Sequence, residues 1–271
     1  MKVRPRSMQR GADPFGLGWR RAERIAAGLV LVFLVAPIIA IVPLSFNSGT
    51  FLHYPLQGVS LRWYRAVLGS APWGHALANS LIVGSCATAL ATVLGTLAAL
   101  GTDRIRARWV PVLAGILIAP MIVPVIITAL GLYLFLAALG LNATYAGLIL
   151  GHTLLATPFV FITVAAALKN LDRDLPRAAA TLGSSPVRAF LTVTLPLTLP
   201  GIVSGALLAF ATSFDEVVLT LFVAGPAQRT LPRQIFDGIR ESINPSILAL
   251  ATMLIAFAVL LLTSAELVRR R

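Results

Sequence analysis

Residues 172–200 read DRDLPRAAATLGSSPVRAFLTVTLPLTLP and form the one long charge-bearing loop on their side of an otherwise apolar chain. Asp174 and Pro176 are helix start signals and Gly183 is a helix stop signal, so a short helix is expected between them. Ser185 is a candidate N-cap followed by a proline, so a second helix should follow at an angle. The pattern predicts a helix–glycine–helix segment, here called the elbow, within a loop at 169–196.

Both helices of the elbow have an apolar face. In the first helix the i, i+3, i+4, i+7 positions are apolar and small enough for close approach of another surface, namely Leu175, Ala178, Ala179 and Leu182. The second helix is expected to end at Leu195-Pro196, and its apolar side chains are Val187, Phe190 and Leu191. These faces favour a docking role, whereas the simpler alternative is a loop helix that only caps the helix bundle.

Residues 177–196 of the elbow have a characteristic spacing of residue types. It runs Arg177-Ala178-Ala179, three residues, Gly183, nine residues, Val193, one residue, then Leu195-Pro196. This resembles the cytoplasmic signature of permease subunits of binding-protein-dependent ABC importers, except that Arg177 replaces the usual glutamate. In that family the elbow is a coupling helix seated in a groove of the ATPase subunit. The resemblance implies an ATPase-coupling role for five residues, Arg177, Ala178, Ala179, Leu182 and Gly183, without the contact of an acidic side chain.

Composition indicates a polytopic membrane protein. The 271 residues are 58% hydrophobic and 12% charged, and the mean hydropathy is +0.88. A net charge of +12 does not indicate a nucleic-acid partner, because the Lys and Arg residues are scattered between apolar spans that face membrane lipid. Cys86 is the one cysteine and lies in an apolar segment, so it is expected to be a small buried residue.

Uncharged runs predict an all-α membrane protein with six transmembrane helices. Each run can cross about 30 Å of hydrocarbon at 1.5 Å per residue. The first run follows a basic segment but is too long for a signal peptide, which favours an uncleaved anchor. The expected spans are 25–46, 77–100, two within 109–168 joined near 140–142, 197–223 and 245–268. A basic tail at 1–24 and a basic end at 269–271 would flank one transmembrane permease domain at 25–268.

The positive charges predict the orientation. Seven Lys and Arg lie in the N-terminal tail, three at 101–108, four in the elbow loop and three at the C-terminal end, against five in the opposite loops. Both termini and the elbow should therefore be cytoplasmic, in a bacterial inner membrane.

No energy source or enzyme chemistry is visible in the sequence. Lys2 and Lys169 do not follow a glycine-rich phosphate loop, and the histidines at 53, 75 and 152 are too far apart for a metal motif. No serine lies in a nucleophile elbow. No cofactor is expected, and ATP hydrolysis would require separate subunits.

Two acids lie inside a predicted span. Asp215 and Glu216 would each cost about 2.5–3.5 kcal/mol at the membrane centre, so they should face a cavity or a partner. Thr212 and Thr220 stand four residues either side of Glu216, which predicts one polar stripe on the fifth span. The stripe would form a substrate pathway attractive to a cation. The structural alternatives are an interhelical hydrogen-bond cluster or carboxylates at the outer interface.

Further motifs narrow the resemblance to the second permease of spermidine/putrescine-type importers. They are Ser213-Phe214-Asp215-Glu216-Val217-Val218, Phe46-Asn47-Ser48, Arg62-Trp63-Tyr64, Pro158-Phe159-Val160 and Leu231-Pro232. The resemblance implies a type I ABC importer permease fold and contact of Asp215 and Glu216 with a polyamine. It also implies four kinds of partner: a second permease, two ATP-binding subunits, an extracytoplasmic solute-binding protein and a small organic solute. Relatives often have an acid where Met121 follows Pro120, so an amino-acid-like or opine-like solute is the alternative.

Proline, histidine and glycine mark the packing of the spans. His152 is expected to hydrogen-bond to a neighbouring helix, with substrate contact as the alternative. Pro111, Pro120 and Pro124 predict kinks or a broken turn whose carbonyls line the cavity or serve packing alone. Glycine pairs four residues apart predict close helix contacts, within the chain or with a partner, at Gly147 and Gly151 and at Gly201 and Gly205.

Two other classes of protein are weighed against an ABC permease. A secondary transporter driven by an ion gradient would show inverted repeats and paired intramembrane charges, and no convincing repeat is visible. An intramembrane enzyme would need a nucleophile or a metal set.

Overall fold

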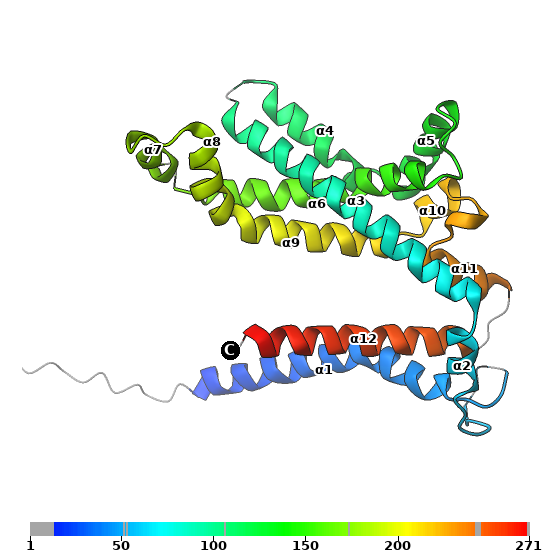
Figure 1. Cartoon of the computed structure of the whole chain (residues 1–271). Coiled ribbons are helices and arrows are strands. Elements are labelled where there is room, and N and C mark those ends of the chain that lie inside the picture. The colour runs from blue at the N-terminus through cyan, green and yellow to red at the C-terminus, as the bar shows by residue number, and fades with distance from the viewer. Residues whose placement is uncertain are drawn as a thin grey trace, which may run out of the picture. The chain divides into compact units, whose positions relative to one another are not determined.

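The computed structural model describes residues 14–50, 52, 54–105, 107–172, 174–241 and 245–269, and nearly all of them are helical (Figure 1). The all-α prediction is therefore confirmed for this part of the chain. Residues 1–13 of the expected tail and 270–271 of the expected C-terminal end lie outside the described residues. The chain divides into two compact units, one comprising Leu68–Ser242 and the other comprising the two terminal parts.

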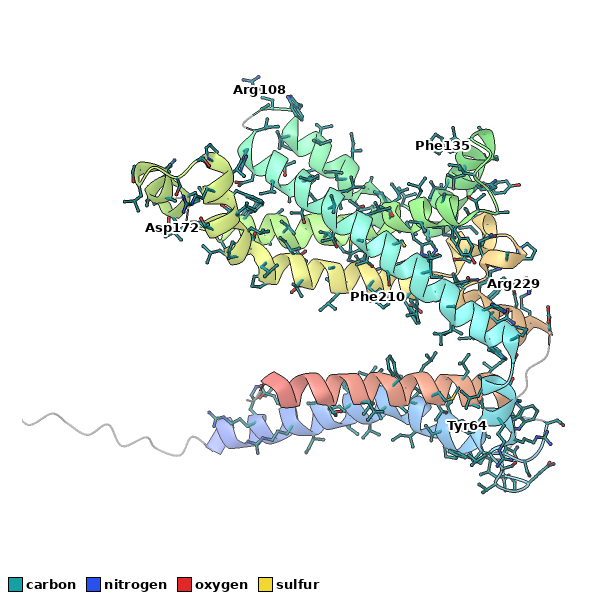
Figure 2. All side chains as sticks on the ribbon, in the orientation of Figure 1. Tyr64, Arg108, Phe135, Asp172, Phe210 and Arg229 are labelled. Carbon is teal, nitrogen blue, oxygen red and sulfur yellow. The ribbon has the colours of Figure 1, made fainter. Side chains whose placement is uncertain are left out.

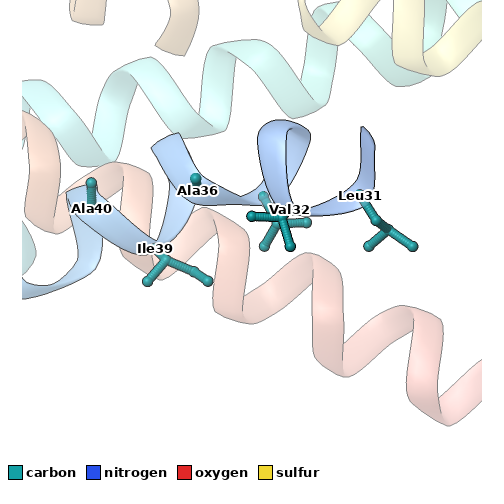
Figure 3. Close-up of a pocket in the computed structure, with 6 residues that line it drawn as sticks. Leu31, Val32, Ala36, Ile39 and Ala40 are labelled. Carbon is teal, nitrogen blue, oxygen red and sulfur yellow. The ribbon is translucent and has the colours of Figure 1, made fainter. Parts of the chain in front are cut away.

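The terminal unit contains α1 (Pro14–Ser45), most of α2 (Arg62–Leu68) and α12 (Pro245–Arg269). Helices α1 and α12 pack along each other (Figure 1). Helix α1 begins inside the segment expected to be a tail. A hollow of about 430 Å³ on α1 has an apolar lining, which suits lipid chains or an apolar helix: Leu31, Val32, Val35, Ala36, Ile39 and Ala40 (Figure 3).

Two motifs on either side of the first loop come together in this unit. The Tyr64 hydroxyl lies 2.6 Å from Ser45 Oγ, and the Trp63 indole donates to the Asn47 carbonyl at 2.9 Å. The rings of Phe46 and Tyr64 are 5.0 Å apart. The end of α1 is thus fastened to α2, which gives the Phe46-Asn47-Ser48 and Arg62-Trp63-Tyr64 motifs a shared structural role.

The larger unit is built on three long helices, α3 (Ala71–Arg104), α6 (Tyr145–Lys169) and α9 (Leu195–Phe214). Each packs against the other two. Their shared core consists mainly of small and branched side chains: Ala91, Ala99, Ala156, Val160, Phe161, Val164, Leu168 and Ala209. Small residues allow the helix backbones to approach closely, because lipid provides no hydrophobic drive for their association. The expectation that Cys86 of α3 is buried was wrong: it is exposed, because an apolar segment of a long helix has residues outside the core as well as in it.

The predicted close helix contact is found within this chain at three of the four glycines, Gly151, Gly201 and Gly205, whereas Gly147 lies against Leu141 in the loop before its own helix. A Cβ at Gly201 would stand 2.6 Å from the Ala167 Cβ, and one at Gly151 would stand 2.9 Å from the Leu219 side chain. At Gly205 a Cβ would collide with Thr163. The glycines therefore set the spacing between α6 and its neighbours.

The third expected span is broken, as its prolines predict. Helix α4 (Val110–Ile122) and helix α5 (Val125–Ala138) are bent by 104° relative to each other. Val123 has an extended backbone, the conformation favoured before Pro124, which lacks an N–H for the helix ladder.

Two expectations about the fifth span, placed at about 197–223, were wrong: the helix stop before it and its continuity to residue 223. The elbow's second helix does not end at Leu195-Pro196. It runs from α8 (Pro186–Ala189) through a π-helical turn at Phe190–Thr194 directly into α9. The Leu195 N–H bonds to the carbonyl of Phe190, five residues earlier, which is the π-helical hydrogen-bond pattern. Pro196 lies in the first α-helical turn after this π-helical turn, where the N–H that proline lacks is not needed.

At the other end, α9 stops at Phe214, and the short α10 (Val218–Val223) follows a break at 215–217. The chain continues through a 3₁₀ turn at Pro226–Gln228 into α11 (Leu231–Glu241).

Within the described residues, four helices are long and apolar enough to cross a membrane, and the α4–α5 pair would make a fifth. Helix α12 is also apolar over Pro245–Leu260. The multi-span architecture is confirmed, while the count of six and the cytoplasmic termini stay predictions.

Candidate functional site

The elbow begins with α7 (Asp174–Thr181), a helix of eight residues without buried side chains. The helix begins at Asp174, one of the two predicted start signals, but the cap is Asp172, whose Oδ1 accepts from the Asp174 N–H at 2.9 Å. Arg177 pairs with Asp174 at 3.1 Å, and both side chains are exposed. Asp172 is labelled beside this helix in Figure 2.

Gly183 ends α7 and turns the chain. Its φ of +85° lies in the left-handed region that favours glycine. The Ser184 N–H bonds to the Ala179 carbonyl and the Gly183 N–H to the Ala180 carbonyl, both at 3.0 Å. These two bonds form a Schellman motif, which satisfies carbonyls that the helix end leaves open. The predicted stop at Gly183 is confirmed.

Ser185 starts the second arm of the elbow. Its hydroxyl accepts from the Arg188 N–H at 3.3 Å, and Pro186 occupies the first helical turn. Local capping therefore fixes the ends of both arms, and the second arm also buries Ala189.

The elbow exposes apolar side chains. Leu182 is 88% exposed and Val187 is 68% exposed, and Leu175 and Ala178 are also exposed. Exposed leucines on the long helices can face lipid, but α7 is not among the helices apolar enough to span. Ala179 is half-buried. The first-arm face predicted from the sequence is thus largely available to a protein partner.

A cavity of about 350 Å³ separates the two arms from the end of α3. Its lining includes two arginines, Arg104 and Arg177, together with Ser184, Phe190 and Thr194, and Arg177 is the one paired with Asp174.

The break at 215–217 forms the second candidate site, and its two acids differ. The Glu216 carboxylate accepts from the Leu219 N–H at 2.8 Å, so it caps the start of α10. The Asp215 side chain is exposed, and among the described residues no hydrogen bond or ion pair involves its carboxylate. Asp215 is available to a solute, while Glu216 is engaged.

The predicted polar stripe does not form, because the helix is interrupted between Thr212 and Thr220. Thr212 lies half-buried in α9. Thr220 lies fully buried in α10, where its hydroxyl donates to the Glu216 carbonyl at 3.2 Å. A stripe requires one continuous helix, and three non-helical residues rotate α10 out of register.

His152 is hydrogen-bonded to neighbouring helices, as expected. The imidazole is 1% exposed, with Nδ1 2.8 Å from Ser213 Oγ and Nε2 3.2 Å from Thr220 Oγ1. Nearby, Phe210 and Phe214 stack with ring centroids 5.7 Å apart at the end of α9, and Figure 2 labels Phe210.

Arg233 of α11 supports the far end of α10, a contact that sequence reasoning missed. Its Nη1 donates to the carbonyls of Thr220 at 3.0 Å and Ala224 at 2.7 Å. Burial lowers the pKa of Arg233, and the nearby carboxylate of Asp237 partly opposes this shift. A basic residue shortly after a helix end is the sequence signal that could have predicted this C-terminal cap.

The structure therefore gathers the predicted residues into two separate sites within the larger unit. The coupling residues 177–183 share the elbow, and Asp215, Glu216 and Thr220 share the break with His152 and Ser213. Among the described residues, no group of three His, Cys, Asp or Glu side chains has the arrangement of a metal site.

Comparison with known proteins gives concordant results. The family model described as "Binding-protein-dependent transport system inner membrane component" matches residues 91–271. The putrescine transport system permease protein PotI of Escherichia coli K12 is 38% identical over 234 residues, covering 84% of this chain and 83% of that protein. The spermidine/putrescine transport system permease protein PotC of Haemophilus influenzae is 32% identical over 243 residues, covering 90% and 94%.

Two solved structures share the fold. A chain of a bacterial ABC transporter involved in import of the acidic polysaccharide alginate has a TM-score of 0.72 at 14% identity, over 96% of this chain and 98% of that one. A chain of a bacterial alginate ABC transporter in complex with an alginate pentasaccharide-bound periplasmic protein has a TM-score of 0.70 at 17% identity, covering 93% and 94%.

Proposed function

The chain belongs to the family of binding-protein-dependent transport system inner membrane components, and from that premise we propose that it imports a small organic cation using ATP hydrolysed by separate subunits. As a member of this family it is a multi-pass inner-membrane permease subunit of an ABC importer, and not itself an enzyme. The proposal concerns its energy source, its partners and its solute.

The exposed apolar face of the elbow is the main support for a separate ATPase partner. Leu182, at 88% exposure, directly follows α7, a capped helix of eight residues that is too short to span the membrane. Such a side chain gains free energy by docking in a groove of another protein, at about 25 cal/mol per Å² of apolar surface removed from water. An ATPase subunit is the partner whose groove would accept it.

The proposed assembly contains this chain, a second permease, two ATP-binding subunits and an extracytoplasmic solute-binding protein. A fold neighbour crystallised with its periplasmic protein supports the last of these partners. Closure of the ATPases on ATP would push the two elbows together. The cavity would then change from inward-facing to outward-facing and receive the solute from the binding protein.

A polyamine such as putrescine or spermidine is the proposed solute. The names of relatives at 31–38% identity support this class, and the exposed Asp215 carboxylate supports a cationic group. Met121, which is 52% exposed, stands where related permeases often have an acid. That substitution favours a solute with fewer positive charges, so an amino-acid-like or opine-like solute is the second candidate.

Uptake into proteoliposomes that contain the whole complex tests the proposal. Putrescine, spermidine, an amino acid and an opine are each offered with the binding protein, with ATP or a proton gradient as the energy source. We expect uptake of a polyamine that requires both ATP and the binding protein. Uptake that persists on a proton gradient without ATP would instead indicate an ion-coupled secondary transporter.

A further inference from the structure

One buried side chain reaches across the break at 215–217. His152 belongs to α6, and its two ring nitrogens contact Ser213 Oγ at 2.8 Å and Thr220 Oγ1 at 3.2 Å. Ser213 lies in the last turn of α9 and Thr220 lies in α10. The imidazole therefore joins the two helices that the break separates.

The hydroxyl of Thr220 sets the direction of these hydrogen bonds. Its hydrogen points to the Glu216 carbonyl at 3.2 Å, which leaves its oxygen to accept from the Nε2–H of His152. A neutral imidazole then accepts at Nδ1 from the Ser213 hydroxyl. The two backbone segments that flank Asp215 are linked by three consecutive hydrogen bonds.

Helix α10 depends on such contacts because it has six residues, too few to be stable by its own hydrogen bonds. Leu219 packs directly on Gly151, the residue before His152, where a Cβ would stand 2.9 Å from the leucine side chain. The turn of α6 at 151–152 thus holds α10 by packing and by hydrogen bonding at once.

We propose that His152 is a positioning residue that holds Asp215 at the place where it meets the transported cation. Its ring is buried and both ring nitrogens already have hydrogen-bond partners, so it does not touch the solute. It acts by fixing Ser213 and Thr220, and with them the three-residue break that presents the carboxylate. This inference rests on the proposed function, and it assigns the substrate-facing role to Asp215.

The test compares variants of the whole complex in proteoliposomes. His152→Leu replaces the imidazole with an apolar side chain of similar size and removes both hydrogen bonds. His152→Gln introduces an amide that can still hydrogen-bond to Thr220. Thr153→Val is the matched control, because the Thr153 hydroxyl bonds only to the Ile149 carbonyl of its own helix, at 2.7 Å.

The readout is solute transported per ATP hydrolysed, measured with saturating loaded binding protein. For His152→Leu we expect a fall of about tenfold in this ratio, with binding-protein-stimulated ATP hydrolysis within about twofold of the parent protein. His152→Gln should recover most of the ratio, and Thr153→Val should preserve it. A role in folding alone would lower assembly and ATP hydrolysis together and leave the ratio unchanged.

A second measurement tests directly whether His152 controls the position of residue 215. In a Cys86→Ser background, the rate at which a cationic methanethiosulfonate modifies Asp215→Cys should change at least about fivefold when His152→Leu is added, because thiol modification depends on access. Thr153→Val should leave the rate unchanged. If His152→Leu fails to assemble, His152→Met, which also lacks both hydrogen bonds of the imidazole, carries the same comparison.

The outcomes separate this inference from the proposed function. An unchanged transport ratio and an unchanged labelling rate in His152→Leu would overturn the positioning role, even if Asp215→Asn blocks uptake. If Asp215→Asn transports the polyamine normally, the cation pathway itself is wrong, whatever His152 does.

Discussion

At the scale of single residues, the structure separates two acids that are adjacent in the sequence. The Glu216 carboxylate accepts a hydrogen bond from the Leu219 N–H, whereas Asp215 is exposed at the break. A substitution at each position should therefore have a different consequence, although the two side chains carry the same charge.

We predict that Asp215→Asn lowers polyamine uptake by about tenfold or more, since one ionic contact to a cation is lost without loss of volume. Glu216→Gln should retain most uptake, because its amide oxygen can still accept from the Leu219 N–H. Uptake of labelled putrescine by the reconstituted complex measures both. Equal losses in the two variants would contradict the division of roles.

Glu216→Ala provides the structural counterpart. Losing a side-chain cap typically costs about 0.5–2 kcal/mol, so this variant should unfold at a lower temperature than Glu216→Gln. Asp215→Asn should unfold like the parent protein, because the described residues give its carboxylate no partner to lose. Thermal unfolding in detergent micelles makes the comparison.

Residue-level prediction from the sequence succeeded where the signal is local. Gly183 as a stop and Ser185 as a cap depend on backbone geometry within four residues, and both are found as predicted. The link from His152 to Ser213 and Thr220 joins residues 61 and 68 positions apart, so no local pattern encodes it. Sequence alone indicated only that a buried histidine needs a partner.

At the scale of helices, the contact between α6 and α9 is set by glycine. Gly201 faces Ala167 and the Thr163 carbonyl, with room for a hydrogen but not for a methyl group. Gly115 of α4 has open space around it and provides a matched control.

Gly201→Ala is predicted to destabilise the protein by about 1–3 kcal/mol, the usual cost of overpacking a tight contact. Gly115→Ala should be neutral or slightly stabilising, because alanine is the better helix former. Unfolding midpoints in the same detergent test this difference. Indistinguishable midpoints for the two variants would show that the helices can separate at no cost.

Helix boundaries were the least predictable part of the fold. Leu195-Pro196 was interpreted as a helix stop, since proline usually interrupts the helical hydrogen bonds. The helix continues instead, because the π-helical turn at Phe190–Thr194 accommodates the proline. The stretch at 215–217 carries no proline or glycine, so its break gave no sequence signal. Tertiary contacts of His152 and Arg233 with Thr220, together with the local cap by Glu216, stabilise the interruption instead.

At the scale of the whole molecule, composition and charge predicted more than any single motif. A chain that is 58% hydrophobic had to be a bundle of membrane helices, and the described residues are nearly all helical. The number of spans was harder to predict, because the bent α4–α5 pair satisfies the same hydropathy pattern as a straight helix.

The distribution of arginines predicts which ends face the cytoplasm. In a Cys86→Ser background, Leu182→Cys should react with a membrane-impermeant maleimide only in inside-out vesicles. Arg229→Cys, at an exposed position labelled in Figure 2, should react only in right-side-out vesicles. The reverse pattern would place the elbow outside the cell.

The central claim is that the elbow passes force from a separate ATPase to the transport pathway. Photo-cross-linking from a benzophenone attached at Leu182→Cys, in membranes that contain the assembled complex, tests it most directly. Leu207→Cys on α9 serves as the control, since Leu207 is 66% exposed on a helix apolar enough to span. We predict that Leu182→Cys cross-links to a nucleotide-binding subunit and Leu207→Cys does not. Cross-links from Leu182→Cys that reach only lipid or another permease would contradict the account.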